Sequence, residues 1–182
     1  MRIFATEMRF RILLYAFLFL AGVPLHAQLM PCDSVVTAFP ADTSGAIADS
    51  LIRYAMHYKG TPYKLGAVGP KQFDCSSFVR HVYAGVGIEI PRYTWTQIKV
   101  GKEIRRVTDL QRGDLVFFGK KRGVRDIGHI GIVVDRDLEH GDFTFIHCGT
   151  TAGVTTVRYS SPYFLMRYMT ARRILPDIPD AR

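Results

Sequence analysis

A cysteine stands directly behind an acidic residue at the predicted beginning of a helix, in the run Phe73-Asp74-Cys75-Ser76-Ser77. Asp74 is a good N-cap residue because its carboxylate can accept hydrogen bonds from the unpaired amides of the first turn. Cys75 would then lie in that turn, where the positive end of the helix dipole favours the thiolate, the nucleophile of cysteine hydrolases. The alternative is a structural residue, since most free cysteines pack as small buried hydrophobic groups.

A nucleophilic cysteine needs an imidazole to take its proton, a group that orients the imidazole, and donors for the oxyanion. Two histidines, His129 and His147, lie in strand-like apolar runs downstream of Cys75. If these runs form a hairpin, both side chains can lie at the same edge of a sheet. His129 would then be the base that faces Cys75, and His147 would orient its far ring nitrogen. On spacing alone, two half-buried histidines with satisfied hydrogen bonds are an equally good interpretation.

The elements that must position these residues are two helices and a series of strands. Apolar spacing predicts a first helix over residues 47–58 and a second from Asp74 to Gly85. Strands are expected over residues 115–118, 129–134, 143–147, 154–159 and 167–175, with turns at 127–128 and 139–142. His129 would begin its strand directly after the first of these turns. Helices followed by antiparallel strands predict an α+β domain.

The first 27 residues have the pattern of a secretory signal rather than of a folded element. Arg9 and Arg11 precede an apolar run of about 12 residues, which is too short to cross a bilayer because a spanning helix needs roughly 20. We therefore expect three parts, a signal peptide over 1–27, a linker or N-terminal arm over 28–46, and one domain over 47–182. The protein would be exported to the periplasm or the exterior, with a membrane anchor only if Cys32 is lipidated.

Composition narrows the partners. Without the predicted signal peptide, which carries three arginines and one glutamate, the formal net charge falls from +8 to +6. This excess suits contact with anionic polymers, and equally with nucleic acid or a membrane surface, although export argues against nucleic acid. The sequence has no zinc-type cysteine pairs and no glycine-rich phosphate loop, so we expect no cofactor and no metal. The basic loop over 120–125 is interpreted first as solvated surface, although it could also contact the substrate polymer. We expect a monomer.

Seven sequence pieces, taken together and in order, resemble the NlpC/p60 cell-wall peptidases. They are Gly60-Thr61-Pro62-Tyr63 with Gly66, Phe73-Asp74-Cys75-Ser76, Pro91-Arg92 with Gln97 and Gly101, Gly113-Asp114-Leu115-Val116-Phe117-Phe118, His129-Ile130-Gly131-Ile132, Phe145-Ile146-His147, and Ala171-Arg172-Arg173. The resemblance implies a papain-like α+β fold, with N-terminal helices packed on an antiparallel sheet of about five to six strands.

The resemblance also implies roles for individual residues. Cys75 would be the nucleophile, His129 the base and His147 the third polar residue. Tyr63 matches a tyrosine whose hydroxyl lies near the nucleophile and helps to hold the oxyanion, although a loop tyrosine can also simply pack on the core. Asp74 and Ser76 match positions that in relatives contact the free amine of an N-terminal L-alanine, a role that is compatible with Asp74 as helix cap.

The function implied is a secreted cysteine endopeptidase that acts on peptidoglycan or muropeptides and cleaves stem peptides at the γ-D-glutamyl–diamino acid bond. The alternatives are an N-acetylmuramoyl-L-alanine amidase and a catalytically inactive wall-binding module. Three positions depart from the family pattern, since Ser77 and Ala67 replace glycines and Cys148 replaces a small residue beside His147. Cys148 raises the further hypothesis of an inactivating disulfide with Cys75 under oxidation.

Overall fold

The computed structural model describes residues 43–121 and 126–178 of the 182-residue chain. The predicted signal peptide and Cys32, nearly all of the predicted linker and most of the basic loop lie outside the described residues. The described helices are α2 (Thr43–His57), α3 (Cys75–Ala84), α4 (Thr94–Gln97) and α5 (Pro162–Leu165), with a 3-10 turn, η1 (Val107–Asp109). No helix in the described ranges is long and apolar enough to cross a membrane.

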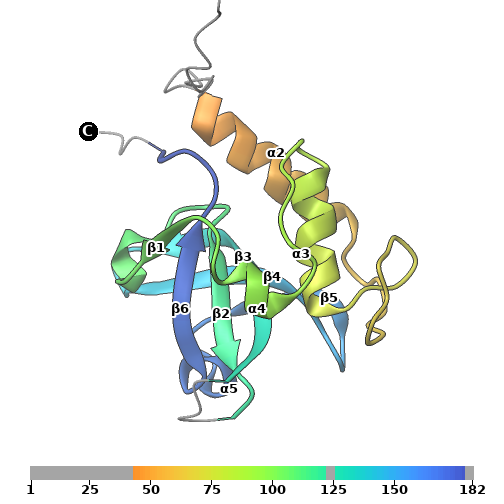
Figure 1. Cartoon of the computed structure of the whole chain (residues 1–182). Coiled ribbons are helices and arrows are strands. Elements are labelled where there is room, and N and C mark those ends of the chain that lie inside the picture. The colour runs from red at the N-terminus through yellow and green to blue at the C-terminus, as the bar shows by residue number, and fades with distance from the viewer. Residues whose placement is uncertain (1–42, 122–125, 179–182) are drawn as a thin grey trace, which may run out of the picture. The chain divides into compact units, whose positions relative to one another are not determined.

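The strands form a six-stranded antiparallel sheet in the order β1-β6-β2-β3-β4-β5. Their bounds are β1 (Lys102–Ile104), β2 (Leu115–Gly119), β3 (Ile127–Asp137), β4 (Asp142–Gly149), β5 (Gly153–Arg158) and β6 (Tyr168–Arg173). Helices α2 and α3 lie together beside this sheet (Figure 1). The predicted α+β fold is confirmed, and β1 is an additional strand that the sequence did not predict.

The sheet separates two apolar cores, because strand residues alternate between its faces. On β2, Leu115 and Phe117 pack with α2 and α3, whereas Val116 and Phe118 belong to the second cluster, with Phe164 of α5. The first cluster includes the predicted apolar face of α3, namely Phe78, Val79, Val82 and Tyr83. Helix α3 packs on β3 and β4, which carry the two candidate histidines.

Helix α3 begins where the sequence predicts, because its N-terminus is capped locally. The Asp74 carboxylate accepts a hydrogen bond from the Ser77 amide at 2.7 Å, and the Ser77 hydroxyl accepts one from the Asp74 amide at 2.9 Å. This reciprocal capping box satisfies two backbone donors that a helix start otherwise leaves free. Ser77, which replaces a glycine of the family pattern, is thus part of the cap.

Several predicted boundaries differ from the structure, and two starts were wrong by two residues or more. Helix α2 starts at Thr43, not at residue 47, and Ser44 of its first turn is buried. Small polar residues suit both helix starts and linkers, so composition did not separate the two. Strand β3 starts at Ile127, so Ile127-Gly128 is strand and not turn. A Cβ atom at Gly128 would lie 2.8 Å from the Lys120 Cα, so this glycine permits the close approach of β3 to the residue after β2.

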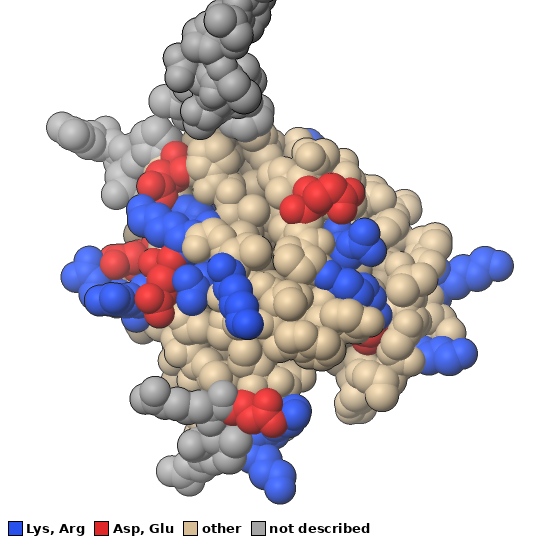
Figure 2. Space-filling model, viewed as in Figure 1, with Lys and Arg blue, Asp and Glu red and all other residues tan. Residues whose placement is uncertain are grey.

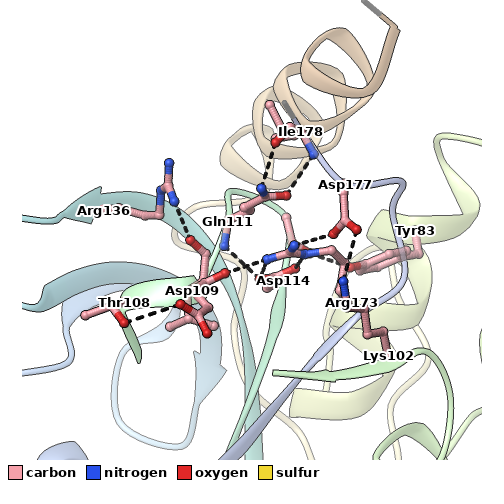
Figure 3. Close-up of polar contacts among 12 residues, drawn as sticks. Tyr83, Lys102, Thr108, Asp109, Gln111, Asp114, Arg136, Arg173, Asp177 and Ile178 are labelled. Carbon is pink, nitrogen blue, oxygen red and sulfur yellow. Dashed lines mark hydrogen bonds and ion pairs between the residues drawn. The ribbon is translucent and has the colours of Figure 1, made fainter. Parts of the chain in front are cut away.

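A buried ion pair links β6 to the beginning of β2. The Arg173 guanidinium donates to both carboxylate oxygens of Asp114 at 2.9 Å, and also to the Asp109 carbonyl and to Asp177 (Figure 3). Asp114 additionally accepts from the Gln111 amide at 2.7 Å. A buried charge is costly unless it is paired. These contacts therefore hold the end of β6 against the start of β2.

Most charged side chains elsewhere lie on the surface. On the face shown in Figure 2, basic side chains occupy several separate places, some directly beside acidic ones, and do not gather in one patch. Several are paired, such as Lys102 with Asp177 and Arg106 with Asp109. Exposed pairs of this kind contribute little to stability.

Candidate active site

One cleft of about 790 Å³ brings together the residues that the sequence singled out for covalent catalysis. Cys75 at the start of α3, Tyr63 of the preceding loop, His129 of β3 and His147 of β4 all line it. Asp74 and Ser76 are not among its lining residues. The cleft therefore unites four of the six predicted site residues.

Cys75 is partly buried, and its surroundings oppose thiolate formation in the resting protein. Burial raises the pKa of its thiol, and the negative charge of Asp74 raises that pKa further. The Thr94 hydroxyl and the backbone N–H groups at Cys75 and Ser76 act in the opposite direction by hydrogen bonding. The first-turn amides therefore favour the thiolate, as the sequence predicts, but burial and Asp74 outweigh them and the pKa of the thiol is raised overall.

The two histidines form a directly hydrogen-bonded pair. Nε2 of His129 lies 2.7 Å from Nδ1 of His147, and the rings meet edge to face at 87°. The hairpin arrangement predicted for their strands is confirmed, with Ile132 of β3 opposite Ile146 of β4. If His129 donates through Nε2, its Nδ1 carries the lone pair that a general base needs.

Both imidazoles are held neutral. Burial and the neighbouring His147 lower the pKa of His129 to about 3, and burial lowers the pKa of His147 to about 4. A neutral imidazole can accept a proton, so His129 is in the protonation state that a general base needs.

Aromatic rings and a glycine fix the orientation of this pair. Phe164 of α5 packs against both rings, with centroid distances of 6.1 Å to His129 and 5.2 Å to His147. A Cβ atom at Gly149 would lie 2.8 Å from the His147 ring, so any larger residue at this position would clash with the ring as it is placed. Neither Phe164 nor Gly149 was predicted as a site residue, although Pro162 is a recognisable start signal for the short helix.

Tyr63 is placed by backbone pairing with Phe73, the residue before the N-cap of α3. The Phe73 amide donates to the Pro62 carbonyl at 3.1 Å, and the Lys64 amide donates to the Phe73 carbonyl at 2.8 Å. The ring is partly exposed, and burial followed by the charges of Cys75 and Asp74 raises the pKa of its hydroxyl. Tyr63 therefore faces the cleft as a neutral hydrogen-bond donor.

Asp74 and Ser76 belong to a closed polar network beside the cleft. Arg92 donates to both oxygens of Asp74, at 2.6 and 3.1 Å, and to the Ser76 hydroxyl at 2.8 Å. The Ser76 hydroxyl donates in turn to Asp74 at 3.1 Å. Both side chains are buried, so every oxygen that could receive a substrate amine already has a protein donor. Their predicted contact with an amine stays a prediction.

Three further side chains, those of Cys148, Trp95 and Lys120, belong to segments that adjoin the site. Cys148 is buried, and its thiol donates to the Phe73 carbonyl at 3.4 Å. Cys148 and Cys75 are both free thiols. Trp95 is 60% exposed and stacks on Tyr93 at 4.4 Å without lining the cleft. Lys120 lines the cleft and pairs with Asp126 at 2.6 Å. No group of His, Cys, Asp or Glu in the described ranges could hold a metal ion.

Comparison with known proteins decides the family. The sequence profile of the NlpC/P60 family matches residues 60–173, a range that contains all four cleft residues. The chain belongs to the NlpC/P60 family. The resemblance inferred from seven short sequence pieces is thereby confirmed.

Two curated relatives and one solved structure illustrate this membership. The NlpC/P60 chain is 37% identical over 119 residues to the murein DD-endopeptidase MepS/murein LD-carboxypeptidase of Escherichia coli K12, covering 65% of this chain and 58% of that protein. It is 32% identical over 130 residues to a γ-D-glutamyl-L-lysine dipeptidyl-peptidase of Bacillus cereus, covering 71% of this chain and 37% of that one.

The solved structure is that of an NlpC/P60 family protein from Bacillus cereus. It is 30% identical and superposes with a TM-score of 0.64, covering 71% of this chain and 40% of that chain. The papain-like fold implied by the resemblance is confirmed by this likeness. The chain spans about half the length of the relatives that it matches, so the activity of the whole protein is a matter for proposal.

Proposed function

We propose that this NlpC/P60 protein is a cysteine peptidase of peptidoglycan that hydrolyses stem peptides at the γ-D-glutamyl–diamino acid bond. The observation that carries the proposal is the 2.7 Å contact between His129 Nε2 and His147 Nδ1 in the cleft that also holds Cys75. With His129 as the donor in this contact, its Nδ1 carries the lone pair of the base. The curated relatives named above, which carry murein and γ-D-glutamyl peptidase names, support the substrate class.

The first half of the reaction forms a thioester. As Sγ of Cys75 attacks the carbonyl carbon, its proton passes to Nδ1 of His129, and the carbonyl oxygen becomes an oxyanion. The resulting imidazolium donates its hydrogen at Nε2 to His147, which holds the ring in place. The same proton then passes to the leaving amine as the C–N bond breaks. This sequence needs no thiolate in the resting protein, which agrees with the raised pKa of Cys75.

The second half consumes water. His129 takes a proton from a water molecule as the water oxygen attacks the thioester carbon, and it returns that proton to Sγ as the C–S bond breaks. The balance is one amide and one water giving one carboxylic acid and one amine. Cys75 and His129 end in their starting protonation states.

The oxyanion requires donors aimed at the carbonyl oxygen. The Tyr63 hydroxyl and the backbone N–H of Cys75, at the positive end of α3, are the proposed donors. The Cys75 amide is one of the first-turn donors that have no partner within a helix. Export of the protein through the segment 1–27 would bring this site to its substrate, and a lipid on Cys32 would keep it at a membrane.

Digestion of purified peptidoglycan by the full chain tests this function. New N-termini on the diamino acid, identified by mass spectrometry, are the expected products. Release of free L-alanine amines would instead support the amidase, and release of no products by the folded protein would support the inactive wall-binding module. Cys75→Ala serves as the blank.

A further inference from the structure

The segment from Pro91 to Gln97 is fastened to the first turn of the nucleophile helix. Gln97 is fully buried, and its amide nitrogen donates to the Ser76 carbonyl at 3.1 Å and to the Pro91 carbonyl at 2.9 Å. From the same segment, Arg92 reaches the side chains of Asp74 and Ser76. These two residues flank Cys75 in the sequence, so this segment holds the nucleophile from both sides.

Asp74 is a buried carboxylate that receives five hydrogen bonds. One oxygen accepts from the Ser77 amide, the Ser76 hydroxyl and Arg92, and the other accepts from Arg92 and from the Gly66 amide at 3.2 Å. The Arg92 side chain is 19% exposed and that of Asp74 8%. Although burial opposes ionisation, the Arg92 and Ser77 hydrogen bonds keep the pKa of Asp74 below its ordinary value. Asp74 is therefore an anion next to the nucleophile.

An anion in this place opposes the chemistry. Negative charge must develop on Cys75 Sγ when the thiol loses its proton, and a nearby carboxylate repels it. The repulsion is reduced when a cation lies on the carboxylate. Arg92 is placed there, with a nitrogen 2.6 Å from Asp74. Asp74 can thus cap α3 while Arg92 reduces the repulsion between its carboxylate and negative charge on Cys75 Sγ.

We propose that Arg92 is a positioning residue that neutralises Asp74 and fixes the first turn of α3, so that negative charge can develop on Cys75 during attack. Nothing in the sequence spacing reveals this role, since Arg92 lies 18 residues after Asp74. The role in turnover rests on the function proposed above, whereas the charge balance at Cys75 can be measured on its own.

The test is the pH dependence of Cys75 alkylation by iodoacetamide, read by peptide mass spectrometry so that Cys32 and Cys148 do not contribute. In Arg92→Met the rate at neutral pH should fall roughly tenfold, with the midpoint displaced to higher pH, because Asp74 becomes an unbalanced anion. Arg92→Lys keeps the cation but loses the bidentate contact, so its rate should lie between those of the wild type and Arg92→Met. Arg80→Met is the matched control, since Arg80 is on α3 but pairs with the exposed Glu89.

A double variant separates charge from folding. Asp74→Asn retains an N-cap oxygen but removes the anion, so Arg92→Met/Asp74→Asn should recover most of the wild-type alkylation profile. A profile of Arg92→Met that superposes on the wild type would overturn the proposal. So would a double variant as slow as Arg92→Met alone while its thermal unfolding matches the wild type. Because alkylation needs no peptidoglycan, a failure of the proposed hydrolysis leaves these outcomes interpretable.

Discussion

The Arg173–Asp114 cluster is buried and the His129–His147 pair only partly so, and the two also differ in how completely their polar atoms are paired. In the first, the guanidinium and the carboxylate each meet several partners, and both side chains are almost fully buried. In the second, one hydrogen bond joins the rings. The other two ring nitrogens, His129 Nδ1 and His147 Nε2, have no protein partner among the described residues.

The difference separates residues that hold the fold from residues that can react. A saturated cluster has no lone pair or proton to offer, so its contribution is to stability. The imidazole pair keeps one basic nitrogen for a cleft that it shares with Cys75 and Tyr63. The Asp74–Arg92 network is saturated like the first, but it adjoins Cys75, so its charges also act on the thiol.

Replacement of His129 is expected to have the largest effect on activity. His129→Gln removes the base while it keeps a polar group of similar size, so the rate of stem-peptide cleavage should fall about a thousandfold. The thermal unfolding midpoint should stay close to that of the wild type. A variant that keeps a tenth of the wild-type rate on purified muropeptides would assign the base elsewhere.

Replacement of Asp114 should show the opposite pattern. Asp114→Ala leaves Arg173 without its main partner, which should lower the free energy of unfolding by about 3 kcal/mol or more. The cleavage rate per folded molecule should be unchanged. Denaturant unfolding and an activity assay on the same samples measure both.

Lys102→Ala is the control for Asp114, because its ion pair with Asp177 is exposed and should contribute less than about 1 kcal/mol. Equal destabilisation by the two variants would contradict the importance given to burial and saturation.

Replacement of His147 should cost less than replacement of His129, because an orienting group assists a base that can still act. His147→Ala should lower the cleavage rate by up to about a hundredfold through misplacement of the ring. His147→Gln, whose amide oxygen can accept from His129 Nε2, should recover part of that loss. Equal rates for the two variants would show that the hydrogen bond does not matter.

The last prediction concerns the pH dependence of stability. The folded pKa values are about 3 for His129 and about 4 for His147, below the ordinary 6.5. At pH values between the folded and the ordinary pKa, the unfolded chain therefore binds more protons than the folded chain. The stabilisation is complete above pH 6.5 and is lost as the pH falls toward these values.

Carboxylates contribute little between pH 6.5 and about 4.5. In that range His129→Gln/His147→Gln should reduce the slope of the unfolding free energy against pH, by an amount that corresponds to the uptake of up to about two protons on unfolding. Urea unfolding at several pH values measures that slope. An unchanged slope in the double variant would contradict the burial of two neutral imidazoles.

Local signals account for what the sequence predicted well. Asp74 and the apolar spacing after it specify the start of α3 from residues that are neighbours along the chain. The meeting of His129 with His147 followed from alternation on two strands, once a hairpin was assumed.

Contacts between distant segments account for what the sequence did not predict. Gly128 looks like a turn residue in the sequence. The structure shows that it is a strand residue at which a side chain would clash with Lys120. Phe164 reaches the histidines from a four-residue helix, and Arg92 reaches Asp74 across a loop. These contacts join segments that are far apart along the chain, so no pattern of residue types in a single sequence reveals them.

The most direct test of the account is the release of soluble muropeptides from purified peptidoglycan by the wild type and by Cys75→Ala, at equal concentrations of folded protein. Cys75 is the one cleft residue that must form a bond with the substrate. The account predicts steady release by the wild type, with new termini at the diamino acid, and none by the variant. Equal release by both proteins would contradict it.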